Sequence, residues 1–105
     1  MSLIIYGFGS FFNGSETFND IDLLIVHSSN SYDSCLEAIA LKREILSRIS
    51  NADVTMLSKS EEIQFNFVEN AKAFPLGSYT EKKKEDIVSD LKLKLCYWQL
   101  SFCNQ

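Results

Sequence analysis

The sequence predicts a small domain of the α/β (α+β) class, in which a mixed β-sheet is packed with helices and a long helix ends the chain. Apolar runs at 3–6 and 23–26 are typical of buried strands, and a third strand is expected over 53–57. Apolar residues at helical spacing over 32–50 and 87–102 indicate two helices. The 105 residues argue for one hydrophobic core.

We therefore expect a single domain with two parts. Residues 1–77 form the core, and residues 78–105 form a C-terminal helix that packs on that core or on a partner. Hydrophobic residues make up 46% of the chain, which is enough for a core that folds without disulfide bridges or a structural metal ion. Glycine and proline are scarce, so we expect neither a linker nor a disordered region.

The first strand is expected over 3–6 and should end at Gly7. Gly9 then permits a sharp turn, and Ser10 can cap a short helix that packs Phe11 and Phe12 onto the core. A strand, a Gly-Ser turn and a helix N-terminus together offer backbone N–H groups and a hydroxyl to an anion. A simple turn with a helix cap is the alternative interpretation of the same residues.

The second strand, expected over 20–26, begins with an aspartate pair. Successive side chains of a strand alternate between faces, so Asp20 and Asp22 point the same way. Neighbouring carboxylates repel each other and lose solvation, so a cation between them is favourable. A solvated aspartate pair at a strand end is the alternative. We interpret His27, where this strand ends, as a polar terminus without a catalytic role.

A helix is expected over 32–50 because its apolar residues repeat at spacings of three and four. This face consists of Cys35, Ala38, Leu41, Ile45 and Ile49. The third strand, 53–57, begins with Asp53 and turns Val54 and Met56 to the opposite face. A third carboxylate is thus expected at the start of a second strand.

Two capping boxes are predicted in the second half of the chain. Ser58 and Glu61 should open a helix over 59–72, after which 73–77 can add a short edge strand. Ser78 and Glu81 should open the final helix, which is expected to continue to about residue 103.

The final helix carries more apolar surface than one face of a small domain needs. One face holds Ile87, Leu91, Leu95, Trp98 and Phe102, and a second flank holds Leu93, Tyr97 and Leu100. The surplus indicates either a protein partner or homodimer contact through 87–102 or extra burial in the core. We interpret Lys82, Lys83 and Lys84, in the expected first turns, as solvated surface; a contact with phosphate or nucleic acid is the alternative.

Composition excludes several classes of protein. The net charge of −4 argues against a surface that tracks nucleic acid throughout. The cysteines, Cys35, Cys96 and Cys103, are odd in number and lack CxxC spacing, so we interpret them as reduced thiols. No apolar run approaches the roughly 18 residues of a membrane span, and the N-terminal stretch lacks the positive start of a secretory signal. We expect a cytoplasmic protein with no membrane contact.

The order of these motifs resembles a known family. The Gly9-Ser10 turn, the Asp20-x-Asp22 pair and the later Asp53 resemble the minimal nucleotidyltransferase domains of the DNA polymerase β superfamily. The resemblance covers 3–57 and fades by residue 76. It implies a nucleotidyltransferase-like fold.

The resemblance also implies a function. Members of the family transfer a nucleoside monophosphate from an NTP, here expected to be ATP, to an acceptor hydroxyl, using two Mg²⁺ ions. By this resemblance Asp20 and Asp22 hold both ions, and Asp53 completes the site of the catalytic ion. Gly9 lets the backbone approach the phosphates, and Ser10 hydrogen-bonds them.

Three features depart from the family pattern. Many small members have an arginine-rich turn after the Gly-Ser pair, whereas this chain has Phe11-Phe12-Asn13-Gly14. Many also have a helix before the first strand, which this sequence lacks. Asn19 replaces a serine that often precedes the aspartate pair.

Two functional hypotheses follow. The first is an enzyme whose acceptor is a protein, a small molecule or RNA; the acidic charge favours the first two. The second is a partner-binding module with weak or no catalysis, such as an antitoxin-like protein that binds its partner through the apolar final helix. A third reading, that the aspartate pair is incidental, assigns no function.

Overall fold

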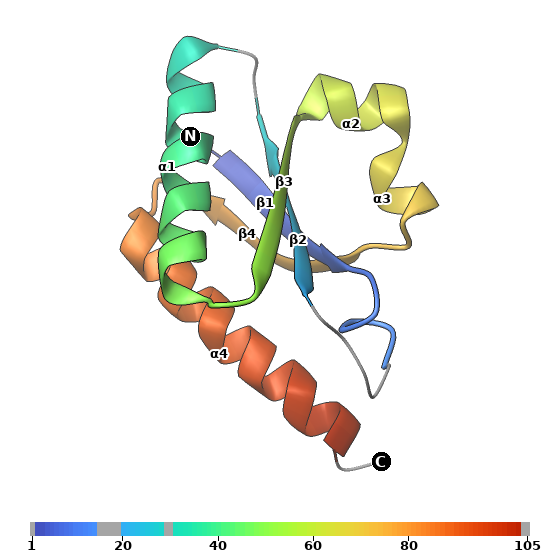
Figure 1. Cartoon of the computed structure of the whole chain (residues 1–105). Coiled ribbons are helices and arrows are strands. Elements are labelled where there is room, and N and C mark those ends of the chain that lie inside the picture. The colour runs from blue at the N-terminus through green and yellow to red at the C-terminus, as the bar shows by residue number, and fades with distance from the viewer. Residues whose placement is uncertain (1, 15–19, 29–30, 104–105) are drawn as a thin grey trace.

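The described part of the chain forms a four-stranded mixed sheet with four helices, and the predicted mixed sheet packed with helices is thus confirmed (Figure 1). The computed structural model describes residues 2–14, 20–28 and 31–103, and only the backbone of 99–103. The strands, in the order β3-β2-β1-β4 across the sheet, are β3 (Ala52–Ser58), β2 (Ile21–His27), β1 (Ser2–Phe8) and β4 (Phe74–Thr80). β1 is antiparallel to both of its neighbours, whereas β2 and β3 are parallel.

Helices lie on both sides of this sheet. α1 (Tyr32–Arg48) and α4 (Lys84–Cys103) pack against one face, and α2 (Lys59–Phe65) and α3 (Phe67–Asn70) lie on the other side (Figure 1). The long C-terminal helix is therefore confirmed. No helix among the described residues is long and apolar enough to cross a membrane.

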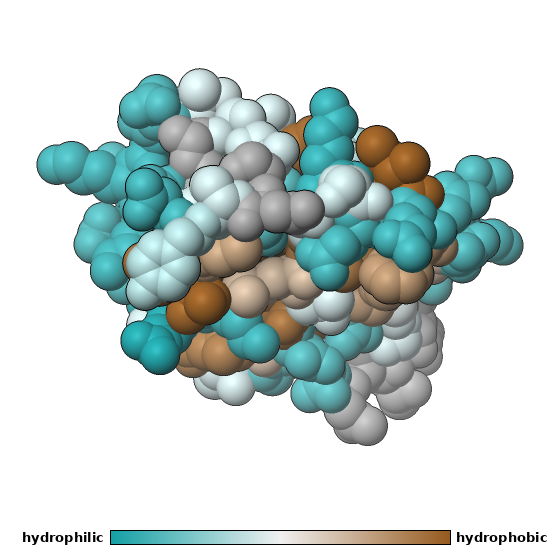
Figure 2. Space-filling view, turned by 90° about the horizontal axis from the view of Figure 1, so that it is seen from above, coloured by the Kyte–Doolittle hydropathy of each residue, from teal (hydrophilic) through white to brown (hydrophobic). Residues whose placement is uncertain are grey.

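The core lies between the sheet and the α1–α4 layer. Alternate residues of β1 and β2 point into it, and the helices contribute the apolar faces predicted from their spacing. Its buried members include Leu3, Ile5, Leu23, Ile25, Ala38, Leu41, Ile45, Ile87, Val88, Leu91 and Leu95. The final helix thus shares the core of the strands. Seen from above, hydrophilic side chains project at both ends of the view, and hydrophobic side chains lie between them and at the upper right (Figure 2).

Polar contacts fasten α4 to its neighbours. The Tyr79 hydroxyl donates to an Asp90 carboxylate oxygen at 2.5 Å, and the Lys94 ammonium donates to the Leu76 carbonyl oxygen at 2.6 Å. The Arg48 guanidinium donates to Ser89 Oγ at 3.1 Å. The hydrogen bond from Tyr79 holds the pKa of Asp90 below its usual value. These contacts fix α4 against both β4 and α1.

The capping box at Ser58 and Glu61 is confirmed, but the helix it opens is shorter than expected. Glu61 N–H donates to Ser58 Oγ at 3.2 Å, and Ser58 N–H donates to Glu61 Oε1 at 2.9 Å. The helix ends at Phe65 because Asn66 adopts a left-handed conformation, with φ of 51°. α3 then follows as a separate short helix.

The capping box expected at Ser78 and Glu81 is wrong. The edge strand predicted over 73–77 exists but extends to Thr80, so Ser78 lies opposite Ile4 in the sheet. Glu81 adopts a left-handed conformation, with φ of 59°, and α4 begins only at Lys84. Pairing with β1 therefore overrides the local helix signal.

Candidate active site

Three neighbouring strands bring the predicted residues to one edge of the sheet. β1 is antiparallel to β2, so its last residue, Phe8, lies opposite Asp22 near the start of β2. β3 is parallel to β2, so Asp53 lies beside Asp22 in register. Gly9 follows directly after β1, and the turn it starts lies near the beginning of β2 in Figure 1. Neighbouring strands thus carry Gly9, Asp22 and Asp53 to a common edge.

The aspartates lie on the sheet face opposite the core. Leu23 and Val54 are buried in the core, so the alternation of each strand turns the preceding aspartate to the other face. Asp22 is half-buried, whereas Asp53 and Asp20, which directly precedes β2, are exposed. The sequence prediction that Asp53 and Val54 point to opposite faces is confirmed.

The surroundings of Asp22 are unfavourable to its negative charge. Burial raises the pKa of Asp22 above the ordinary value, and the neighbouring charges of Asp53 and Asp20 raise it further. The charged form of Asp22 is therefore disfavoured by its surroundings. A bound proton or a bound cation would offset this penalty.

Gly9 is in direct contact with the Asp22 carboxylate. Its φ of 81° lies in the left-handed region, which glycine adopts without steric cost. A Cβ placed on Gly9 would collide with Asp22 Oδ2. Only glycine therefore fits both this backbone conformation and this approach to the carboxylate.

The turn after Gly9 is held by aromatic packing rather than by the short helix that the sequence predicted. The N–H groups of Phe12 and Asn13 donate to the Gly9 carbonyl oxygen at 3.2 and 3.1 Å, and no helix forms over 10–14. Gly14, with φ of 80°, turns the chain out of the helical conformation. Phe11 and Phe12 are buried, as expected. Ser10, the residue after Gly9, is exposed and caps no helix.

Phe12 anchors this turn to both the sheet and α4. A Cβ on Gly7 would collide with the Phe12 ring, so the ring lies directly against the backbone of β1. The ring centroid of Phe12 is 4.9 Å from that of Phe11 and 5.3 Å from that of Trp98. α4 thus helps to position the Gly9-Ser10 turn.

An aromatic pair on the aspartate face of the sheet, Phe8 with Phe67, was not predicted from the sequence. Phe8 lies opposite Asp22 in register and therefore on the same face of the sheet. Its ring meets that of Phe67 from α3 edge to face, with centroids 5.2 Å apart. The alternation of β1 was the available signal for Phe8, but nothing local in the sequence indicated Phe67.

The chemistry of the aspartates fits a hard divalent cation, although their side chains do not form a closed metal site. Carboxylate oxygens are the ligands that Mg²⁺ prefers, and the mutual repulsion at Asp22 favours a cation. Among residues 2–14, 20–28 and 31–103, no group of three or more His, Cys, Asp or Glu side chains is arranged to hold a metal ion. Asn19, the departure noted before the aspartate pair, lies outside the described residues.

Substituting Gly9 with alanine should destabilise the protein by about 1–2 kcal/mol through its left-handed backbone, with a further loss from the contact with Asp22. Gly14→Ala is the matched control because it carries the same backbone cost. Urea denaturation of Gly9→Ala, Asp22→Ala and the double variant measures the coupling. If the changes in unfolding free energy of Gly9→Ala and Asp22→Ala simply added in the double variant, the contact between Gly9 and Asp22 would be contradicted.

A comparison of this chain with models of protein families, with curated proteins and with solved structures finds no match.

Proposed function

We propose that this protein is a Mg²⁺-dependent nucleotidyltransferase. It transfers a nucleoside monophosphate from an NTP, expected to be ATP, to a hydroxyl of a protein, a small molecule or RNA. One observation carries the proposal: Asp22 lies beside Asp53 in the sheet and against the backbone of Gly9, where burial and then the charges of Asp53 and Asp20 raise its pKa. Carboxylates in mutual repulsion next to an open glycine turn are suited to a divalent cation and a phosphate chain.

The residues have distinct roles in this proposal. Asp20 and Asp22 would hold two Mg²⁺ ions, and Asp53 would complete the site of the catalytic ion. The ions would supply the positive charge that the triphosphate and the attacking oxygen need for in-line displacement. Gly9 leaves room for the phosphates against its backbone, and the Ser10 hydroxyl donates a hydrogen bond to a phosphate oxygen.

The transfer step needs no further co-reactant. The acceptor oxygen forms a bond to the α-phosphorus while the bond from that phosphorus to pyrophosphate breaks. The acceptor proton passes to a carboxylate oxygen of Asp53, which lies beside Asp22 in the sheet. The products are the nucleotidylated acceptor and pyrophosphate.

Titration calorimetry with each NTP, with and without Mg²⁺, tests this proposal. We expect Mg²⁺-dependent binding by the wild type and its loss in Asp20→Ala, which removes one charge from the repelling group. Asp33→Ala is the matched control, because Asp33 is an exposed acidic residue in the first turn of α1. An unchanged affinity of Asp20→Ala for Mg²⁺–ATP would contradict the assignment of two metal ions to these aspartates.

A specific observation also supports the second candidate, a partner-binding module of the antitoxin-like kind. On α4, Leu93 is 56% exposed and Tyr97 is 65% exposed, although the rest of the described apolar face is largely buried. Such side chains are suited to a protein partner or a second copy of the chain. Absence of NTP binding by the wild type in the same titration would favour this module.

Cys35 and Cys96 are free thiols, which fits the reducing cytoplasm that we propose as the setting.

A further inference from the structure

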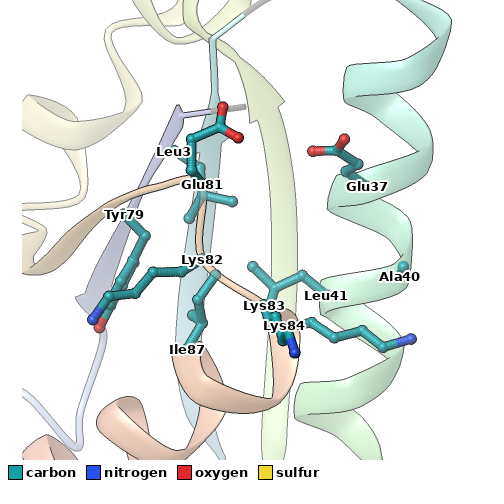
Figure 3. A pocket seen from close by; sticks show the side chains of 10 residues that line it. All are labelled: Leu3, Glu37, Ala40, Leu41, Tyr79, Glu81, Lys82, Lys83, Lys84 and Ile87. Carbon is teal, nitrogen blue, oxygen red and sulfur yellow. The ribbon is translucent and has the colours of Figure 1, made fainter.

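A hollow lies at the other end of β1 from the aspartates. It has a volume of about 320 Å³ and lies where the start of β1 meets α1, the end of β4 and the start of α4 (Figure 3). Leu3, Leu41 and Ile87 contribute apolar side chains to its lining. Leu3 is separated from Gly9 by six residues of strand, or roughly 20 Å. The hollow is therefore a site distinct from the proposed active site.

Charged side chains divide this hollow into two ends. Glu37 and Glu81 bring their carboxylates to one end, whereas Lys82, Lys83 and Lys84 extend from the other (Figure 3). The two carboxylates thus lie apart from the lysines, whose ammonium groups point in different directions around the other end of the apolar lining (Figure 3). A volume near 300 Å³ lies at the lower limit of small-molecule pockets, so the hollow suits a small ligand.

The lysine end suits a multiply charged anion. Three consecutive cations repel one another, and they lie just before or at the first residue of α4, where the helix dipole also disfavours positive charge. Lys82 is partly accommodated, because its ammonium lies 5.9 Å from the ring centroid of Tyr79. A phosphate group, with charge near −2, would relieve the repulsion among the three.

The carboxylate end suits an ammonium group. Glu37 and Glu81 come from different elements, α1 and the β4–α4 connection, and both line the same hollow. A ligand that was anionic throughout would be repelled at this end. Glu81 is also held in a left-handed conformation, with φ of 59°, which is uncommon for a residue other than glycine, asparagine or aspartate.

We propose that this hollow binds a small zwitterion with a phosphate at one end and a primary amine at the other. The lysines receive the phosphate, and Glu37 and Glu81 receive the ammonium. The apolar lining contacts the short carbon chain between them. The arrangement selects by charge separation rather than by net charge.

Two-dimensional ¹H–¹⁵N NMR titration with O-phosphoethanolamine tests this proposal. We expect saturable shifts of the amides of Leu3, Leu41 and Ile87, with those of Gly9 and Ser10 unchanged. Lys83→Gln/Lys84→Gln should weaken binding by about tenfold. Lys92→Gln is the matched control, because Lys92 is an exposed lysine of α4 that does not line this hollow. Absence of saturable shifts in the wild type would overturn the proposal.

Glu37→Gln distinguishes a zwitterion site from a plain anion site. It should weaken O-phosphoethanolamine binding but leave the binding of inorganic phosphate unchanged or strengthened, because it removes only the partner of the amine. Phosphate that binds the wild type as tightly as O-phosphoethanolamine would overturn the proposal. So would tighter binding of both ligands by Glu37→Gln. Neither result depends on whether the protein binds NTPs.

Discussion

Replacing Asp22 with asparagine should stabilise the metal-free protein at neutral pH. Folding raises the pKa of Asp22 through burial and through the charges of Asp53 and Asp20. The stability associated with a raised carboxyl pKa is fully present below the unfolded value of about 3.8 and is lost as the pH rises through the folded value. The Tm of Asp22→Asn should therefore exceed that of the wild type at pH 7, and the difference should vanish below about pH 3.8.

The same substitution should abolish the proposed activity. We expect kcat/KM for Mg²⁺-dependent nucleotide transfer to fall by about a thousandfold, which corresponds to about 4 kcal/mol of transition-state stabilisation. Saturating Mg²⁺ should raise the Tm of the wild type but not that of Asp22→Asn. Measurement of both proteins by calorimetric scanning, with and without Mg²⁺, checks this expectation.

Asp33→Asn is the control for both measurements, because Asp33 is an exposed aspartate in the first turn of α1. It should keep the Mg²⁺ response of the wild type. A lower Tm for metal-free Asp22→Asn at pH 7 would show that the carboxylate stabilises the fold, which contradicts the repulsion inferred at this edge of the sheet.

Phe12→Ala should cost about 3–5 kcal/mol of unfolding free energy. The Phe12 side chain is only 1% exposed, and its ring packs against Gly7, Phe11 and Trp98. Its removal leaves a cavity between β1 and α4 that the rigid strand backbone cannot fill. Urea denaturation measures the loss, and the milder Phe12→Leu keeps the protein measurable if the alanine variant unfolds.

Phe65→Ala provides the comparison for Phe12→Ala. The Phe65 side chain is 56% exposed at the end of α2, so its removal should change the unfolding free energy by less than about 1 kcal/mol. Similar losses in the two variants would contradict the view that Phe12 anchors the turn beside the aspartates.

The sequence predicted most of the elements because their hydrophobic periodicity is strong. The continuous apolar runs at 3–6 and 23–26 indicated buried strands, and both runs lie in strands that contribute to the core. The expected helix over 32–50 exists as Tyr32–Arg48. These patterns are local, so the sequence contains them without knowledge of the pairing.

Two identical local patterns show where such prediction ends. Ser58 and Ser78 each precede a glutamate by three residues, yet only Ser58 caps a helix. Ser58 pairs with His27, the last residue of β2, so the sheet ends there and a helix can begin. Ser78 still lies opposite Ile4 inside β1, so pairing continues. Which outcome occurs depends on the length and register of a distant strand.

The geometry of the candidate site likewise depends on pairing between distant segments. The sequence predicted Asp22 near the start of one strand and Asp53 at the start of the next, and the structure pairs these two residues. The contact of Gly9 with the Asp22 carboxylate depends on the antiparallel register that sets Phe8 opposite Asp22. The packing of Phe12 on Trp98 joins opposite ends of the chain. No local pattern contains either contact.

The aromatic packing around α4 also gives the protein an intrinsic optical reporter. Trp98 is the only tryptophan of the chain, and its ring centroid lies 5.3 Å from that of Phe12 and 5.2 Å from that of Phe74. Its fluorescence therefore depends on whether α4 remains docked against the turn and the edge strand. An emission change that precedes the loss of far-ultraviolet circular dichroism would reveal undocking of α4 before the sheet unfolds.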